Sequence, residues 1–159
     1  ALVEKLGLAE RVELVGYVQP TTLGAYYEAA DVLVMPLRVT PRSNYFMSPL
    51  KMFEYMTARR AIVASDVPVA REVLHDGDNA LLVDPENPVA LADAIRRLAQ
   101  TPGLADRMAE ASYRDAVQYG LAQKCERMLA FMEELVGDHS GGRSIDSGDE
   151  AESGASTGD

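Results

Sequence analysis

The sequence predicts an open α/β fold, in which helices flank a parallel β-sheet, and two observations lead to this prediction. First, β-rich runs alternate with helical patterns as far as Val83, as they do in strand–helix–strand units. Second, most of these runs are continuously apolar rather than alternating, which is typical of strands that helices cover on both faces. The four predicted strands are residues 12–15, 31–35, 61–65 and 80–83, and the last three are the continuously apolar ones.

Helical patterns occupy the stretches between and after these runs. They cover residues 22–29, 48–58 and 69–75, and helices alone are predicted beyond Asp84. Asn87-Pro88 and Thr101-Pro102 each combine an N-cap residue with proline at the first helical position, and the second of these helices runs to about residue 120. A last helix is predicted over residues 121–136. Residues 137–159 are rich in Gly, Ser and acids with little to bury, so we expect a domain at 1–136 and a disordered tail at 137–159.

The charge of the chain argues against two classes of partner. Its formal net charge is -10, and from residue 137 onward there are six acids and one arginine, so the tail supplies half of it. The remaining mild acidity does not favour a nucleic-acid-binding surface, which would show clustered Lys and Arg, or a polybasic patch for anionic lipid. No apolar run reaches the roughly 18–20 residues that cross a membrane. We therefore expect neither nucleic acid nor a membrane as a partner.

Cysteine and histidine are too few for a disulfide framework or a metal centre. The chain has Cys125, His75 and His139, and no Cys/His cluster has metal-ligand spacing. We expect no metal and a reducing, cytoplasmic location. The chain begins without Met and without a signal-peptide layout, and its first residues resemble a helix interior. This start leads us to expect a fragment of a longer protein.

A candidate anion site lies at the start of the helix predicted over residues 48–58. Ser48 suits the N-cap and Pro49 the first turn, which leaves the N–H groups of Leu50 and Lys51 free. A lysine in the first turn is opposed by the helix dipole, by roughly 0.3–1 kcal/mol, and a bound phosphate would reverse the sign of that contribution. Because ligands of open α/β sheets lie at the carboxyl ends of strands, this helix start predicts a phosphate or diphosphate site.

Glu54 follows Lys51 by three residues and could accept hydrogen bonds from ribose or sugar hydroxyls. Two other interpretations remain open from the residues alone. Ser-Pro begins many helices, and Lys51 with Glu54 could be an ordinary surface pair worth about 0.2–0.5 kcal/mol. Ser48 and Lys51 also have the Ser-x-x-Lys spacing of serine acyl-enzymes, although the Ser-Asp-Asn and Lys-Thr-Gly segments of those enzymes are missing.

Several stretches, taken together, resemble a known family. Over roughly residues 1 to 136 their order and spacing are similar to the C-terminal, nucleotide-sugar-binding domain of GT-B glycosyltransferases. The resemblance is to group 1, often called family four, which has a Rossmann-like open parallel sheet. The matching stretches are residues 8–18, 26–36, 48–56, 61–68, 71–73 and 76–83.

The resemblance implies roles for particular residues. It implies that Gly16, Tyr17 and Val18 line the pocket for the base. It also implies that residues 48–51 (Ser48, Pro49, Leu50 and Lys51) lie beside the donor diphosphate. The acid that holds the ribose is implied to be Glu54. Glu54 matches the second acid of a Glu-x7-Glu motif, whereas Phe46 stands where the first acid is expected. The donor sugar is therefore expected to be held by a different group.

The activity implied by the resemblance is transfer of a sugar from a UDP-, GDP- or ADP-sugar to an acceptor hydroxyl, with retention of configuration. Lys51 and Glu54 are the expected catalytic residues, and no metal or other cofactor is expected. The acceptor, a glycan, a lipid or a small molecule, is expected to bind mainly to an N-terminal domain that this chain lacks, so the fragment alone should be inactive. Asp76-Gly77-Asp78 is interpreted as a turn rather than a metal site. The alternatives are another GT-B chemistry, an epimerase or phosphorylase, and a non-catalytic subunit that binds a nucleotide sugar.

Overall fold

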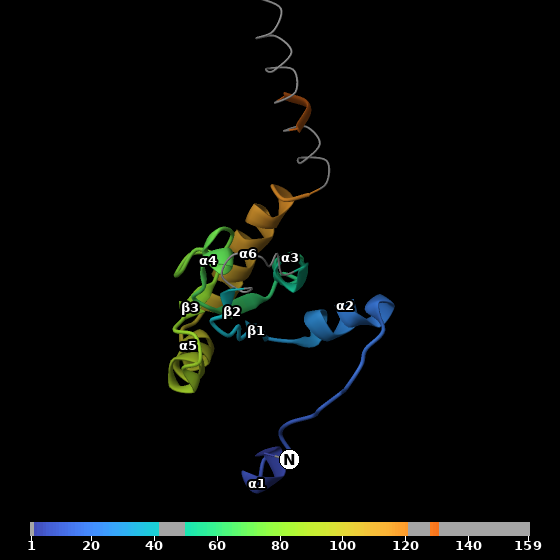
Figure 1. Ribbon diagram of the computed structural model, residues 1–159, viewed down its shortest axis with the longest axis vertical. Coiled ribbons are helices and arrows are strands. Elements are labelled where there is room, and N and C mark those ends of the chain that lie inside the picture. The colour runs from blue at the N-terminus through green and yellow to red at the C-terminus, as the bar shows by residue number, and fades with distance from the viewer. Residues whose placement is uncertain (1, 42–49, 121–127, 131–159) are drawn as a thin grey trace, which may run out of the picture. The chain divides into compact units, whose positions relative to one another are not determined.

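The structure is a computed structural model that describes residues 2–41, 50–120 and 128–130. Its helices and strands alternate as the sequence predicts, and they are labelled in Figure 1. In chain order the elements are α1 (Leu2–Lys5), α2 (Pro20–Ala29), β1 (Val32–Met35), α3 (Leu50–Thr57), β2 (Ala61–Ser65), α4 (Pro68–Arg71), β3 (Leu81–Val83), α5 (Pro88–Gln100) and α6 (Leu104–Val117). Residue contacts divide the chain after Gly120 into two units, and the fold described here is that of the first.

The three strands form one parallel sheet in the order β1-β2-β3. Val32 lies opposite Ala61, and Val63 lies opposite Leu81. The predicted α/β class with an open parallel sheet is therefore confirmed. Because the strands are parallel, their carboxyl ends meet at one edge of the sheet, and the segments that lead to α3, α4 and α5 leave from that edge.

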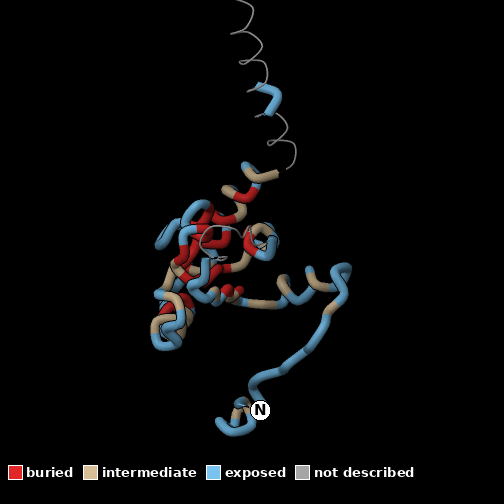
Figure 2. Tube along the Cα trace, viewed as in Figure 1, coloured by how far each residue is buried: buried red, intermediate tan, exposed pale blue. Residues whose placement is uncertain are grey.

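The core lies on both faces of β2, whose five residues are all buried. Ile62 and Ala64 belong to a cluster with Met52 and Met56 of α3, whereas Val63 belongs to a second cluster with residues of α5 and α6. Figure 2 shows the buried residues gathered around the sheet and the helices that follow it. The prediction of burial on both faces is confirmed for β2.

The same prediction is wrong for β1, although its residues are just as apolar. Leu33 and Met35 are buried, whereas Val32 and Val34 keep intermediate exposure. β1 lies at the edge of the sheet among the described strands, so it has a neighbouring strand on one side only. A continuous apolar run therefore identifies the strand correctly but overestimates its burial.

The strand predicted at residues 12–15 is not formed, and this prediction is wrong. The segment that leads into α2 has no regular structure, and Leu14 and Tyr17 are 76% and 82% exposed. Figure 2 shows it as an exposed stretch between α1 and α2. A strand needs a neighbour for its backbone hydrogen bonds, and none of the described strands lies beside this segment. Local β-propensity alone is not sufficient.

The helices differ from expectation mainly at their ends. α2 begins at Pro20, because proline suits the first helical position. α4 ends at Arg71 rather than at His75, and beyond it Asn79 Oδ1 accepts from the backbone nitrogen of His75 over 2.7 Å. α5 has the predicted cap, in which Asn87 Oδ1 accepts from the backbone nitrogen of Ala90 over 3.0 Å.

The remaining sequence predictions lie largely outside the described residues. α6 confirms the helix predicted after Thr101-Pro102. Of the helix predicted over 121–136, only residues 128–130 are described, and they are helical. The domain boundary at residue 136 and the tail at 137–159 lie outside the described residues and stay predictions.

Candidate functional site

Glu54, on α3, is hydrogen-bonded to a tyrosine of the neighbouring helix α2. The hydroxyl of Tyr27 donates to Glu54 Oε2 over 2.9 Å. The Tyr27 ring packs edge-on against Tyr55, with 5.1 Å between the ring centroids and 77° between their planes. Arg60, just beyond α3, donates from Nε to the carbonyl oxygen of Glu28 over 3.1 Å. Three contacts to two successive residues of α2 thus join it to α3 and the segment that follows.

A cavity of about 320 Å³ lies between these two helices. Tyr27 and Glu54 both line it, so the carboxylate is held by a partner and is also reachable from solvent. Its other walls combine apolar and small residues with a threonine and a second glutamate, and the full lining is Pro20, Leu23, Gly24, Tyr27, Glu28, Glu54, Thr57 and Ala58. A ligand with an apolar ring and adjacent hydroxyl groups would match this combination.

Burial, followed by the hydrogen bond to Glu54, raises the pKa of Tyr27 to about 12. Tyr27 therefore keeps its proton at neutral pH and acts as a donor to the carboxylate. Burial also raises the pKa of Tyr55. Both tyrosine rings consequently stay neutral throughout the physiological pH range.

Lys51 lies in the first turn of α3 and is exposed. It forms no ion pair with Glu54 or with any other residue that the structure describes, so the surface pair left open by the sequence is not formed. Residues three apart on a helix lie on the same face, which places Lys51 one turn before Glu54. The lysine is therefore available for an external anion. Of the other residues predicted here, Leu50 is 75% exposed at the helix start.

The rest of the predicted diphosphate site lies outside the described residues. Ser48 and Pro49, as well as Phe46, are in the undescribed stretch 42–49. The Ser-x-x-Lys interpretation, which depends on Ser48, falls there too. The roles expected for these residues stay predictions.

Gly16, Tyr17 and Val18, predicted to line the base pocket, lie in the exposed segment ahead of α2. No described hydrogen bond or ring contact joins them to Lys51 or Glu54. Gly16 has a φ of 77°, a left-handed conformation that favours glycine. Pro20, two residues after Val18, lines the cavity. The structure thus brings this segment to the entrance of α2 but not to Glu54, and its role stays a prediction.

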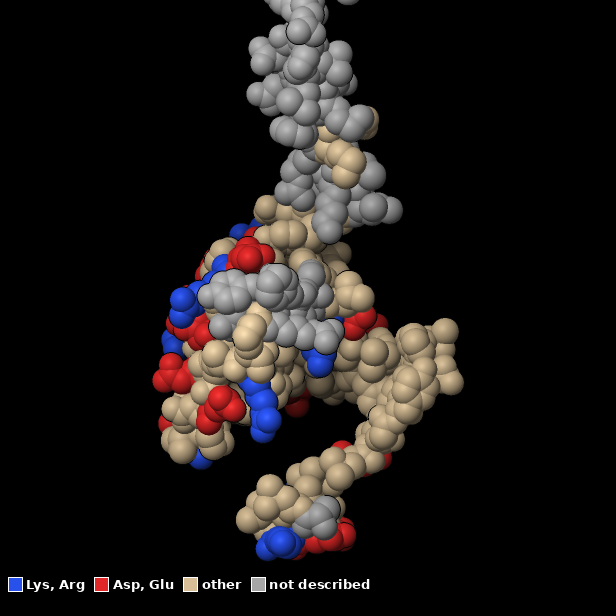
Figure 3. Space-filling model, viewed as in Figure 1, with Lys and Arg blue, Asp and Glu red and all other residues tan. Residues whose placement is uncertain are grey.

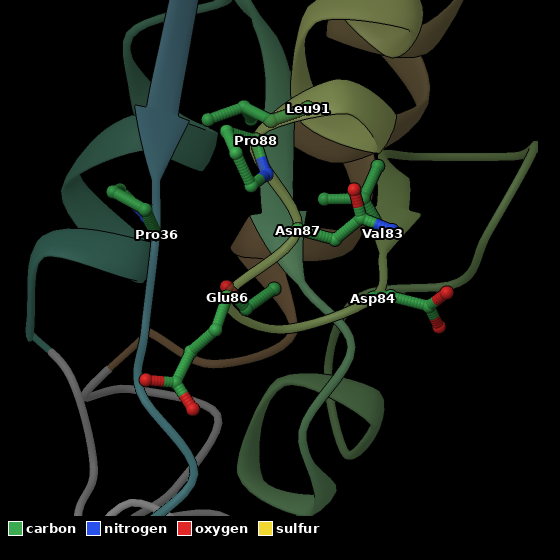
Figure 4. A pocket seen from close by; sticks show the side chains of 8 residues that line it. Pro36, Val83, Asp84, Glu86, Asn87, Pro88 and Leu91 are labelled. Atoms are coloured by element: carbon green, nitrogen blue, oxygen red, sulfur yellow. The ribbon is translucent and has the colours of Figure 1, made fainter.

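A second cavity, of about 190 Å³, lies at the carboxyl edge of the sheet, where its lining comes from the ends of all three strands and the start of α5. Figure 4 shows the carboxylates of Asp84 and Glu86 extending away from Pro88 and Leu91. Glu86 is also within 3.8 Å of Arg38 Nε. The cavity wall is therefore mainly apolar, and Asp84 and Glu86 are the charged residues among those that line it.

A third cavity, of about 440 Å³, is lined by most of the titratable side chains that follow β2 and α4, namely Asp66, Arg71, His75 and Asp76. Arg71 Nη2 donates to Asp66 Oδ2 over 2.7 Å, and this hydrogen bond lowers the pKa of Asp66. Asp76 Oδ1 accepts from the backbone nitrogen of Leu82 over 2.9 Å. Because both carboxylates already have partners, the cluster does not favour the acid–base chemistry of an epimerase.

The motif Asp76-Gly77-Asp78 forms the predicted turn. Gly77 has a φ of 78°, and its nitrogen donates to the carbonyl oxygen of Ala80 over 2.9 Å. Within the described part of the chain, no three His, Cys, Asp or Glu residues are grouped so that they could hold a metal ion.

Charges of both signs share the visible surface of the described residues. Figure 3 shows Lys and Arg interspersed with Asp and Glu on the face that it displays. Among the described residues, no helix is both long enough and apolar enough to span a membrane.

Comparison with known proteins identifies the family. The family model for glycosyl transferases group 1 matches residues 1–101. Alpha-D-kanosaminyltransferase of Streptomyces kanamyceticus is 29% identical over 135 residues, which cover 84% of this chain and 33% of that protein. D-inositol 3-phosphate glycosyltransferase of Streptomyces coelicolor is 32% identical over 120 residues, 75% of this chain and 25% of that protein. The chain thus spans a quarter to a third of the length of these relatives.

Solved structures give the same result for the fold. Sucrose-phosphate synthase from Thermosynechococcus elongatus matches with a TM-score of 0.71 and 26% identity, over 86% of this chain and 33% of that one. HepE of Anabaena, solved in complex with UDP, matches with a TM-score of 0.72 and 18% identity, over 83% of this chain and 35% of that one. The resemblance inferred from the sequence motifs is therefore confirmed, and the chain belongs to the family of glycosyl transferases group 1.

Proposed function

We propose that this chain is the nucleotide-sugar-binding part of a glycosyltransferase that transfers a sugar to an acceptor hydroxyl with retention of configuration. One observation carries the proposal. Glu54 is held by Tyr27 in the wall of the α2–α3 cavity, one helical turn after the exposed Lys51. A carboxylate acceptor and an exposed cation thus lie one turn apart on the same helix.

This arrangement matches the chemistry of a nucleoside diphosphate. The vicinal hydroxyls of a ribose can donate to the Glu54 carboxylate, while the diphosphate lies toward the first turn of α3. There Lys51 and the free N–H groups of the helix start supply positive charge. During transfer, negative charge grows on the departing diphosphate, and these groups would stabilise it. The proposal requires no metal or other cofactor, because Lys51 and the helix start provide the charge.

The relatives support a sugar-transfer reaction, since one is named as a kanosaminyltransferase and the other as a D-inositol 3-phosphate glycosyltransferase. HepE shares only the fold with this chain, and its complex with UDP therefore serves to choose the first nucleotide to be tested. The donor base, its sugar, the acceptor, the retaining course and a cytoplasmic location all belong to the proposal.

The test is calorimetric titration of the protein with UDP, GDP and ADP, followed by the corresponding nucleotide sugars. We expect one of the three nucleotides to bind and the others to bind more weakly. Lys51→Ala should weaken binding of that diphosphate about tenfold or more, because a hydrogen bond to a charged group contributes about 1.5–3 kcal/mol, and should leave binding of the nucleoside unchanged.

Arg107→Ala is the matched control, since Arg107 is another exposed cation but lies on α6. It should leave the affinity for the diphosphate unchanged. If none of the nucleotides binds, or if Lys51→Ala changes affinity no more than Arg107→Ala, the proposed function is contradicted.

A further inference from the structure

We infer that Tyr27 is a positioning residue, which fixes the Glu54 carboxylate so that its free oxygen accepts hydrogen bonds from the ribose of the nucleotide. The inference rests on the function proposed above and extends it to a residue on a different helix. It begins from the hydrogen bond between the Tyr27 hydroxyl and Glu54 Oε2, which joins residues 27 positions apart in the sequence.

The position of the Tyr27 ring is itself determined by the core. The ring packs edge-on against Tyr55, and Tyr55 packs in turn against the cluster that contains Met52 and Met56. Aromatic rings in this arrangement prefer a defined geometry. The Tyr27 hydroxyl is therefore directed at the carboxylate from a fixed ring rather than from a freely rotating side chain.

The backbone of α2 is fixed at the adjacent residue. Arg60 donates from Nε to the carbonyl oxygen of Glu28 over 3.1 Å and also donates to it from Nη2. Arg60 lies in the short link between α3 and β2, so both of its hydrogen bonds join α2 to the segment that follows α3. The end of α2 that carries Tyr27 is therefore held at its backbone by Arg60, and the Tyr27 ring is held by Tyr55.

The hydrogen bond leaves the carboxylate free to bind a ligand. A carboxylate offers about four acceptor positions on its two oxygens, and Tyr27 occupies one of them, on Oε2. No other described side chain is hydrogen-bonded to this carboxylate, so Oε1 and the second lone pair of Oε2 can accept from a ligand in the cavity that Glu54 lines. A glutamate on a helix surface otherwise loses rotamer freedom when it binds, and Tyr27 removes that freedom before the ligand arrives.

The experiment compares Tyr27→Phe with the unmodified protein, using the nucleoside diphosphate that binds best and its 2′,3′-dideoxy analogue. Phenylalanine keeps the ring and its contact with Tyr55 but removes the hydroxyl. We expect Tyr27→Phe to weaken binding of the ribonucleotide about three- to tenfold and to leave binding of the dideoxy analogue unchanged. A purely structural role would weaken both ligands alike.

Two further variants complete the design. Tyr26→Phe is the matched control, because Tyr26 is the neighbouring and more exposed tyrosine of α2, and it should change neither affinity. In Glu54→Ala, the additional change Tyr27→Phe should have no further effect, since a positioning residue acts only through the group that it positions.

The outcomes separate the two proposals. If the unmodified protein binds no nucleotide, both the proposed function and this inference are overturned. If it binds and Glu54→Ala weakens binding while Tyr27→Phe does not, only the inference is overturned. The inference is also overturned if Tyr27→Phe weakens the dideoxy analogue as much as the ribonucleotide, or still weakens binding when Glu54 is already alanine.

Discussion

Asn79 Nδ2 donates to Asp115 Oδ2 over 2.8 Å, which joins the turn before β3 to helix α6. The Asn79 side chain is completely buried, and its remaining hydrogen bonds also stay within the protein. Nδ2 donates to the carbonyl oxygen of Val73 over 3.1 Å, and Oδ1 accepts from the backbone nitrogen of His75 over 2.7 Å. The Asn79 side-chain amide thus pairs with two backbone groups of the segment after α4 and also links that segment to α6.

Asn79→Ala should be among the more destabilising substitutions in this chain. It would leave a buried N–H and a buried carbonyl without their partners and would separate Asp115 from the turn. We expect the free energy of unfolding to fall by about 2–4 kcal/mol, measured by urea denaturation. Asn87→Ala is the comparison, because Asn87 caps α5 at the surface and its loss should cost only about 1 kcal/mol. Equal losses in the two variants would contradict the role assigned to Asn79.

Arg59 combines an unfavourable backbone conformation with favourable side-chain contacts. Its φ is 52°, a left-handed conformation, while its guanidinium carbon lies 3.9 Å from the centroid of the Tyr113 ring. Arg59 Nε is also 3.8 Å from Glu110 Oε1. Arg59 directly precedes Arg60, whose side chain is hydrogen-bonded to α2. The stability of this turn therefore bears on how α2 is held beside α3.

Substitution by glycine and by alanine should separate these two effects. Arg59→Gly loses the ring contact but relieves the backbone, whereas Arg59→Ala loses the contact and keeps the backbone conformation. Left-handed backbone costs a non-glycine residue about 1–2 kcal/mol, and an exposed cation–π contact contributes about 0.5–1 kcal/mol. We therefore expect Arg59→Gly to be nearly neutral and Arg59→Ala to be less stable by about 1 kcal/mol. An alanine variant as stable as the glycine variant in urea denaturation would disprove the strain.

The sequence predicts a strand correctly where the strand is central and covered on both faces. The run at 61–65 is correct in type, bounds and burial, because β2 is the central strand and helices cover both of its faces. The run at 12–15 is also β-rich, although it contains Glu13, but it has no neighbouring strand among those described and remains exposed. Strand pairing is a non-local property, so a single run of residues does not determine it.

The candidate site shows the same division. Lys51 and Glu54 are predicted as site residues because their spacing on one helix can be read along the chain. Tyr27 was not recognised as a partner, because its contact with Glu54 depends on how α2 packs beside α3. The cavity between the two helices has the same origin, and no periodicity in the sequence connects its walls.

Ser112 should be a site where a smaller side chain improves stability. It is completely buried in α6, and its hydroxyl oxygen has no hydrogen-bond partner among the described residues. Ser112→Ala removes a buried polar group and introduces a stronger helix former, so we expect a gain of about 1 kcal/mol. The matched control is Ser65→Ala, since Ser65 Oγ is also buried but accepts from the backbone nitrogen of Leu37 over 2.8 Å. It should lose about 1 kcal/mol, and a shift of both variants in the same direction would contradict the assignment.

The pair Asp66–Arg71 should make stability depend on pH in the acid range. The hydrogen bond from Arg71 lowers the pKa of Asp66 in the folded protein, so the ionised carboxyl favours folding at pH values above its unfolded pKa of about 3.9. As the pH falls below that value and through the lower folded pKa, this contribution is lost. The difference in urea midpoint between the unmodified protein and Asp66→Asn should therefore be constant from about pH 7 to 5 and shrink steadily below about pH 4.

Asp93→Asn removes a more exposed carboxylate from its pair with Arg96, and it should give a smaller difference because surface ion pairs contribute little. A difference for Asp66→Asn that persists unchanged below pH 3 would show that the side chain acts through packing rather than through its charge.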